Sequence, residues 1–214
     1  MCGRYFLTDQ VGENERMAAI IQEMNRSGSP AAALFQPGEM FPTQLAPVIV
    51  AQQGRAVVRP MRWGFPFGSS GKVVINSRSE KADYTPMFQK AVRERRCLVP
   101  VSSYFEWRRT ASGAKTKDKF AITSQGGQEK GMMYLAGVWG EFFGGFEKGG
   151  YEGFAILTQD ADEQISPYHD RMPVIMDSEN LKKLWLFAPP QFPYQELRRQ
   201  FEKPKLYVTP ISQP

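Results

Sequence analysis

The second residue of the chain is a cysteine, one of only two among 214 residues. Removal of Met1, which is usual before a small residue, would leave Cys2 with an α-amine of pKa roughly 7.7–8.0 beside a thiol of roughly 8.5. Such a 1,2-aminothiol reacts with an aldehyde in two steps, because the amine forms an imine and the thiol then closes a five-membered thiazolidine ring. From position alone, the simpler interpretation is a small residue at a frayed terminus.

The only histidine, His169, lies in the stretch SPYHDRMP. Its position between Pro167 and Pro173, beside Asp170 and Arg171, is typical of a loop that presents polar groups. Histidine is the usual proton shuttle near neutral pH. A lone histidine is also often a structural side chain, so the sequence leaves both roles open.

A carboxylate stands among aromatic residues in the stretch SSYFEWRR. Strand alternation places Tyr104, Glu106 and Arg108 on one face and Phe105 and Trp107 on the other. Glu106 in such surroundings would have a raised pKa and could act as acid and base in turn. The alternative is an exposed strand carboxylate paired with a neighbouring arginine.

Polar residues of two further stretches could bind substrate. In INSR, Asn76 and Arg78 fall on the same face of an expected strand, and Arg4 follows Cys2 at the same spacing. An asparagine amide can orient an amine or an aldehyde oxygen, and an arginine can bind a phosphate. Each arginine taken singly is better explained as a surface charge.

The composition limits the class of protein. The net charge of +5 and pI near 9.2 lean toward a polyanionic partner without establishing one. No apolar run is long enough to cross a membrane, and the N-terminus has no signal-peptide pattern. Two cysteines and one histidine make neither a disulfide framework nor a Cys/His zinc site, so we expect a reducing, cytoplasmic location and no metal.

The order of hydrophobic patterns predicts an α+β fold with a largely antiparallel sheet, because strands mostly follow strands. Met17, Ile20, Ile21 and Met24 recur at helical spacing. Helices are expected at about 14–26, 86–96, 178–185 and 194–201. Strands are expected at about 3–8, 46–50, 56–63, 73–78, 97–107, 119–124, 132–140, 151–159 and 205–212. Residues 63–72 are expected to be irregular, and 110–119 to form a basic loop. A turn is expected at QQGR (52–55), an edge or a bulge at Pro100, and a helix cap at Asp177 or Ser178.

MCGR, WGF, INSRSE, CLVPVSSYFEW and YHDRMPV follow one another along the chain. In this order they resemble the SRAP (SOS-response-associated peptidase) family of abasic-site processing proteins. The resemblance spans nearly the whole chain and implies one domain over residues 1–214, whose antiparallel sheet forms a partly barrel-like core with a few flanking helices. It implies a protein that forms a thiazolidine crosslink with an abasic site in single-stranded DNA, as part of the DNA damage response, without a cofactor.

The same resemblance assigns roles to the matching residues. Cys2 would be the nucleophile, Asn76 would hold the sugar and the terminal amine, Glu106 would be the general acid and base, and His169 would transfer a proton to the sugar oxygen. Contacts to DNA are implied for Arg4, Arg78, Arg171, Trp63 and Phe67. The family's peptidase name implies self-removal of Met1, and lyase activity is a further expectation.

Two stretches depart from the family pattern. MFPTQLAP stands where a YNxAP-like stretch is common, and Phe65 and Phe67 stand where relatives often have tryptophan. Two other functions use the same residues. A cysteine peptidase or N-terminal-nucleophile amidohydrolase would use Cys2 against an amide, whereas a non-covalent binder of single-stranded DNA would not need Cys2.

Overall fold

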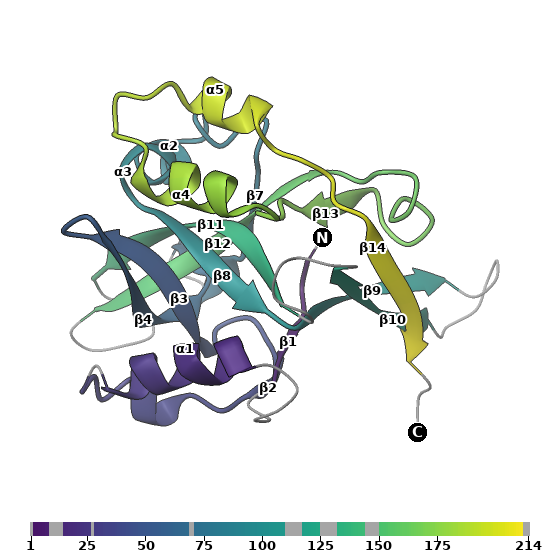
Figure 1. Ribbon diagram of the computed structural model, residues 1–214, viewed down its shortest axis with the longest axis horizontal. Helices are drawn as coiled ribbons and strands as arrows, with labels where there is room; N and C mark the ends of the chain where they lie inside the picture. Colours follow the sequence, from purple (N-terminus) through teal and green to yellow (C-terminus); the bar gives the residue numbers. More distant parts are fainter. Residues whose placement is uncertain are drawn as a thin grey trace.

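Two mainly antiparallel sheets contain most of the strands of the computed structural model (Figure 1). The structure describes residues 2–8, 15–26, 28–68, 71–109, 117–124, 132–143 and 150–211. Met1 and most of the expected basic loop at 110–119 lie outside these residues. The expected α+β fold is confirmed.

The first sheet closes on itself. Its ring consists of β11 (Met133–Phe142), β8 (Arg96–Val101), β3 (Leu45–Gln52), β4 (Arg55–Trp63) and β12 (Tyr151–Asp160). Closure comes from β11, which pairs with both β8 and β12. The expected barrel-like core is therefore confirmed, and closure leaves these strands without the open edges that promote aggregation.

The β3–β4 hairpin is the longest-paired part of the barrel, running from Leu45↔Arg62 to Gln52↔Arg55. Its two turn residues, Gln53 and Gly54, both have positive φ, at 51° and 74°. Two such residues give the twist that suits a tight hairpin. The turn expected at QQGR is thus confirmed.

One edge of β12 is shared by two strands that are separated in sequence. Gly153 and Phe154 pair in parallel with the end of β4, and Ile156 to Thr158 then pair in parallel with β7 (Asn76–Arg78). Between β4 and β7 the chain leaves the barrel as a small hairpin, β5 (Phe65–Phe67) and β6 (Lys72–Val74). The expectation of an irregular 63–72 segment was therefore wrong over most of its length.

Gly64 makes this departure from the barrel feasible. Its φ of 135° suits glycine, and a Cβ there would lie 2.7 Å from Cβ of Val73. The glycine lets the β5–β6 hairpin fold back closely, so that the chain rejoins β12 at Asn76.

The second sheet has five strands. Their order is β14 (Leu206–Ile211), β10 (Lys117–Ser124), β9 (Ser103–Arg109), β1 (Tyr5–Leu7) and β2 (Gly38–Met40). The chain passes directly from β8 in the barrel to β9 in this sheet, with only Ser102 between them. The Ser102 backbone N–H bonds the Phe6 carbonyl, and its hydroxyl accepts from the Thr8 N–H, so the crossing point is tied to the N-terminal segment.

The residue Pro100, which was expected to mark an edge or bulge, lies inside the barrel strand β8 and pairs with Tyr134. On its other side, the register with β3 includes only Leu98 and Cys97. Pro100 therefore lies beyond the part of β8 that pairs with a strand on each side. A residue without a backbone N–H is tolerated there.

Helices cover the barrel on two sides (Figure 1). Their bounds are α1 (Glu15–Arg26), η1 (Ala32–Leu34), α2 (Pro86–Gln89), α3 (Ala91–Glu94), α4 (Glu179–Phe187) and α5 (Tyr194–Arg199). The helix expected at 86–96 is thus two short helices, and Arg96 already belongs to β8. Ser178 caps α4 by accepting a hydrogen bond from the Leu181 N–H at 3.2 Å, as expected.

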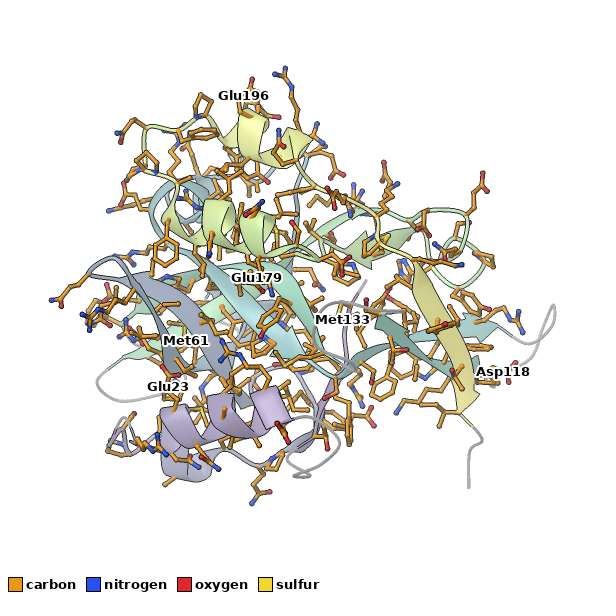
Figure 2. All side chains as sticks on the ribbon, in the orientation of Figure 1. Glu23, Met61, Asp118, Met133, Glu179 and Glu196 are labelled. Atoms are coloured by element: carbon orange, nitrogen blue, oxygen red, sulfur yellow. The ribbon has the colours of Figure 1, made fainter. Side chains whose placement is uncertain are left out.

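Helix α1 packs on the β3–β4 hairpin. Met17, Ile20 and Met24 are buried there, as their spacing predicts. Figure 2 labels Glu23 on α1 and Met61 on β4, one of the barrel strands on which the helix packs. Glu23 also accepts a hydrogen bond from the Val58 N–H in β4, at 3.2 Å. Within the described residues, no helix has the length and apolar character needed to span a membrane.

A buried arginine joins the helices to the barrel. Arg96 donates to the carbonyls of Val92 and Arg93, at 3.0 and 2.6 Å, and to those of Trp185, at 2.6 Å, and Ala188. These carbonyls lie at the C-terminal ends of α3 and α4, where helices carry partial negative charge. One guanidinium group thus neutralises two helix ends inside the protein.

We predict that Arg96→Leu lowers the free energy of unfolding by about 3 kcal/mol, because several buried carbonyls lose a charged donor. Urea unfolding followed by circular dichroism measures this. The matched control is Arg95→Leu, since Arg95 forms a half-exposed ion pair with Glu141 and should cost less than about 1 kcal/mol. Equal losses for the two variants would contradict the role given to Arg96.

Candidate active site around Cys2

The residues Cys2 and Asn76 are joined by a hydrogen bond. The Asn76 side-chain nitrogen Nδ2 donates to the main-chain carbonyl of Cys2 at 3.0 Å. Asn76 is the first residue of β7, which pairs with β12 of the barrel, whereas Cys2 precedes β1 of the second sheet. Two of the four expected catalytic residues are therefore in contact, although 74 positions separate them.

The Cys2 side chain is fully buried. Its sulfur Sγ lies 3.9 Å from the Arg4 carbonyl oxygen. Burial raises the pKa of the Cys2 thiol well above its ordinary value, and the negative charge of Glu106 raises it further. The thiol is thus held in its protonated form at neutral pH, and a reaction through its sulfur needs a base nearby.

The carboxylate of Glu106 lies in the same buried region. Its side chain comes from β9, opposite Phe120 of β10, and the residue is only 3% exposed. The alternative of an exposed strand carboxylate is therefore wrong. Because the charge of Glu106 raises the pKa of both Cys2 and Tyr104, the carboxylate lies within electrostatic range of the thiol. The charge of Glu106 therefore acts on the Cys2 thiol.

The loop before β13 (Arg171–Pro173) carries His169 and packs on the second sheet. The Tyr168 ring lies 4.6 Å from the ring of Phe120, the residue opposite Glu106. Asp162, at the start of this loop, contributes to the raised pKa of Tyr104. These contacts bring the histidine loop against the strand pair that presents Glu106.

The imidazole of His169 has two neighbours at one nitrogen. Nδ1 accepts a hydrogen bond from the Arg171 N–H at 2.9 Å and also lies 2.6 Å from a carboxylate oxygen of Asp170. These contacts need opposite protonation of Nδ1. The neutral ring, with its proton on Nε2, can accept the Arg171 N–H at Nδ1, and the imidazolium ring, protonated on both nitrogens, can donate from Nδ1 to Asp170.

Two of the three expected phosphate-binding arginines are accessible. Arg78 is exposed on β7. Arg4 is half-buried, with its guanidinium 3.6 Å above the Phe41 ring and 3.2 Å from Glu39. The other Glu39 oxygen lies 2.6 Å from the Lys119 ammonium, so one carboxylate holds two cations.

The third arginine, Arg171, is placed differently from the expectation. Its side chain is buried, and its guanidinium pairs with Glu80 at 2.8 Å and with Asp160. It also donates to the Thr158 carbonyl at 2.8 Å. A buried guanidinium needs such counter-charges. The expected DNA contact is corrected to a structural one that joins β12, β13 and the segment after β7.

The two aromatic residues expected to contact DNA differ in exposure. Trp63 is fully buried, donates from Nε1 to the Ile75 carbonyl at 3.1 Å, and packs 4.9 Å from the Tyr5 ring. A base cannot stack on it, so this expectation is corrected: Trp63 supports the strand that carries Asn76. Phe67, at the tip of β5, is 55% exposed and accessible to a partner.

Two tyrosines near Cys2 had no role in the sequence analysis. Tyr5 and Tyr104 are fully buried, and a negative charge at Cys2 raises the pKa of each beyond the effect of burial. Strand alternation placed Tyr104 on the same face as Glu106, and this pattern could have identified Tyr104 as a residue of the site. Nothing in the spacing identified Tyr5. Within the described residues, no group of His, Cys, Asp or Glu side chains is arranged to bind a metal ion.

The whole chain, residues 1–214, matches the sequence model of the SOS response associated peptidase (SRAP) family. The protein belongs to the SRAP family. Several curated relatives carry the name abasic site processing protein. YoqW of Bacillus subtilis is 27% identical over 192 residues, which is 87% of this chain and 80% of that protein. YedK of Escherichia coli is 31% identical over 129 residues, covering 59% and 54%, and HMCES of Mus musculus is 25% identical over 169 residues, covering 64% and 46%.

Solved structures share the fold of this SRAP member. A protein from Bacteroides thetaiotaomicron superposes with a TM-score of 0.73 at 19% identity, over 99% of this chain and 92% of that one. A phage-related protein from Bordetella bronchiseptica gives 0.70 at 22% identity, over 99% and 95%. At these identities the similarity establishes the architecture alone.

We predict that neither thiol of the chain that retains Met1 reacts readily with a disulfide reagent at pH 7 to 8. Cys2 and Cys97 are both buried, and burial raises the pKa of both thiols, so little thiolate is available. Absorbance of the released chromophore counts reactive thiols before and after unfolding in guanidinium. Two thiols should appear only after unfolding, and one fast equivalent in the folded protein would contradict the placement of Cys2.

Proposed function

We propose that this protein processes abasic sites in single-stranded DNA by bonding covalently to them through Cys2, once Met1 has been removed. The observation that carries the proposal is the contact of Asn76 with the Cys2 main chain, next to the buried Glu106 carboxylate. The names of the family relatives support the same substrate.

The proposed reaction begins at the sugar. His169, in its imidazolium form, gives the proton on Nε2 to the ring oxygen of the deoxyribose, and the proton of the C1′ hydroxyl passes to a water molecule, so the ring opens to an aldehyde. The α-amine of Cys2 adds to C1′, and the resulting carbinolamine loses water to form an imine. The sulfur then bonds to C1′ and the thiol proton passes to the imine nitrogen. The thiazolidine forms with release of one water and without any change of oxidation state.

Within this scheme Glu106 is the proton carrier. It takes a proton from the attacking amine and returns it to the departing hydroxyl group. The raised pKa of the Cys2 thiol gives the same carboxylate a second task, since the sulfur has to lose its proton as it attacks. Asn76 keeps the Cys2 main chain in place during both steps.

The proposal also includes a lyase activity, which follows from the imine, and self-removal of Met1. An imine at C1′ acidifies the protons on C2′, so elimination of the 3′ phosphate would make the protein a lyase. Self-removal of Met1 by the Cys2 and Glu106 groups would account for the peptidase name of the family. General proteolysis is disfavoured, because a cysteine peptidase needs a thiol with a lowered pKa and burial raises that of Cys2.

We predict that the trimmed protein forms an adduct with single-stranded DNA bearing one abasic site. The adduct should survive denaturing electrophoresis and have the summed mass of protein and DNA less one water. Cys2→Ala should abolish it, and the matched control Cys97→Ala, which changes the other buried thiol, should keep it. An equal yield from Cys2→Ala would leave the proposed chemistry without its nucleophile.

We also predict that initial binding to intact single-stranded DNA weakens as salt rises, because arginine contacts release counterions from phosphates. Arg78→Ala should lower the slope of log affinity against log salt by about 0.7, the value for one phosphate contact on a single strand. The control Arg55→Ala removes the same charge at the distant β3–β4 turn and should leave the slope unchanged (Figure 1). Fluorescence anisotropy measures both; identical slopes would argue against a phosphate contact by Arg78.

A further inference from the structure

Two buried tyrosines lie opposite each other on strands β1 and β9. Tyr5 and Tyr104 are Cα partners in the antiparallel register, so their side chains lie on the same face of the second sheet. Both residues are fully buried. Neither phenolic oxygen has a hydrogen-bond partner among the described residues. Leaving such a group unsatisfied lowers the stability of the folded protein, so two of them on neighbouring strands call for an explanation.

A third buried polar atom of the same kind lies close by. The side-chain oxygen Oδ1 of Asn76 also has no hydrogen-bond partner in the described part of the chain, although the amide nitrogen of the same group holds the Cys2 carbonyl. The two phenols and this oxygen therefore supply two donors and one acceptor beside the proposed nucleophile.

Packing and electrostatic interactions place both phenols in the region of Cys2. The Tyr5 ring packs on Trp63, which is itself bonded to the carbonyl of Ile75, the residue before Asn76. Charge at Cys2 acts on both phenols, and charge at Glu106 acts on Tyr104. Burial raises the pKa of both hydroxyls well above the ordinary value, so both remain protonated donors throughout the physiological range.

We propose that the Tyr5 and Tyr104 hydroxyls donate hydrogen bonds to the aldehyde oxygen of the abasic sugar while the Cys2 amine attacks C1′. The inference rests on the proposed function and adds two catalytic residues to it. As the nitrogen–carbon bond forms, the electron pair of the C=O bond moves to the oxygen, which takes up a proton and later leaves as water. Two fixed neutral donors stabilise the charge that develops on this oxygen, in the manner of an oxyanion hole.

A structural role would look different, and the chain contains an example. The buried Tyr194 hydroxyl donates to the Ser79 carbonyl at 2.8 Å, which joins α5 to the segment after β7. Its hydroxyl has a fixed protein acceptor. Those of Tyr5 and Tyr104 have none among the described residues, which fits groups that are kept for a substrate.

The test compares Tyr5→Phe, Tyr104→Phe and the control Tyr194→Phe, each in trimmed protein verified by intact mass. Single-turnover crosslinking to abasic single-stranded DNA should slow by on the order of 100-fold in each of the first two variants. Their melting midpoints should equal or exceed that of the parent, because no protein hydrogen bond is lost and an unsatisfied hydroxyl is removed. Their affinity for intact single-stranded DNA should equal that of the parent. Tyr194→Phe should crosslink at the parent rate and melt about 2–4 °C lower.

The outcomes separate this inference from the proposed function. If the trimmed parent protein forms no adduct, the proposed function fails. If the parent reacts and both Tyr5→Phe and Tyr104→Phe react at the parent rate, only the donor role is overturned. A parent rate combined with a fall in melting midpoint like that of Tyr194→Phe would assign the two hydroxyls to stability instead.

Discussion

The hydrogen bond from the Asn76 amide to the Cys2 carbonyl is the contact on which the arrangement of the site depends, because it joins the two sheets. Asn76 reaches this place because β7 continues along the β12 edge where β4 leaves off. Cys2 reaches it because β1 lies between β2 and β9 in the second sheet. Each partner is positioned by a different sheet, so this hydrogen bond depends on how the two sheets pack against each other.

The second constraint is the single-residue passage from β8 to β9 at Ser102. The chain continues from β8, which is mostly apolar, into β9, which places the side chains of Tyr104 and Glu106 in the protein interior. Burial of these groups beside Cys2 opposes stability, and natural proteins accept such a cost mainly at functional sites. The site is therefore assembled from strand ends at the junction of the two sheets, with the large apolar core of the barrel supporting it.

Much of the fold was predictable from the sequence, because the dominant signals were local. The spacing of Met17, Ile20 and Met24 identified α1, and QQGR identified the β3–β4 turn. The closeness of Asn76 and Cys2 was predictable only through the family resemblance, since no local pattern relates residues in different sheets.

The errors arose where position depends on distant strands. The resemblance implied a DNA contact for Trp63, yet the parallel pairing with β12 holds its strand end in the core. It also implied a DNA contact for Arg171, whose partners Glu80 and Asp160 come near it only after β7 and β13 have both paired with β12. In both cases tertiary pairing decides the exposure of the side chain.

The carboxylate of Glu39, shared by Arg4 and Lys119, has a consequence for how a negatively charged chain could be received. If the Arg4 guanidinium turned toward a phosphate, Glu39 would still be neutralised by the Lys119 ammonium, so no bare carboxylate would repel the incoming charge. The Phe41 ring beneath Arg4 offers a flat surface over which the guanidinium can shift without losing contact. Because two cations share the Glu39 carboxylate, Arg4 could leave it for a phosphate while Lys119 keeps it neutralised.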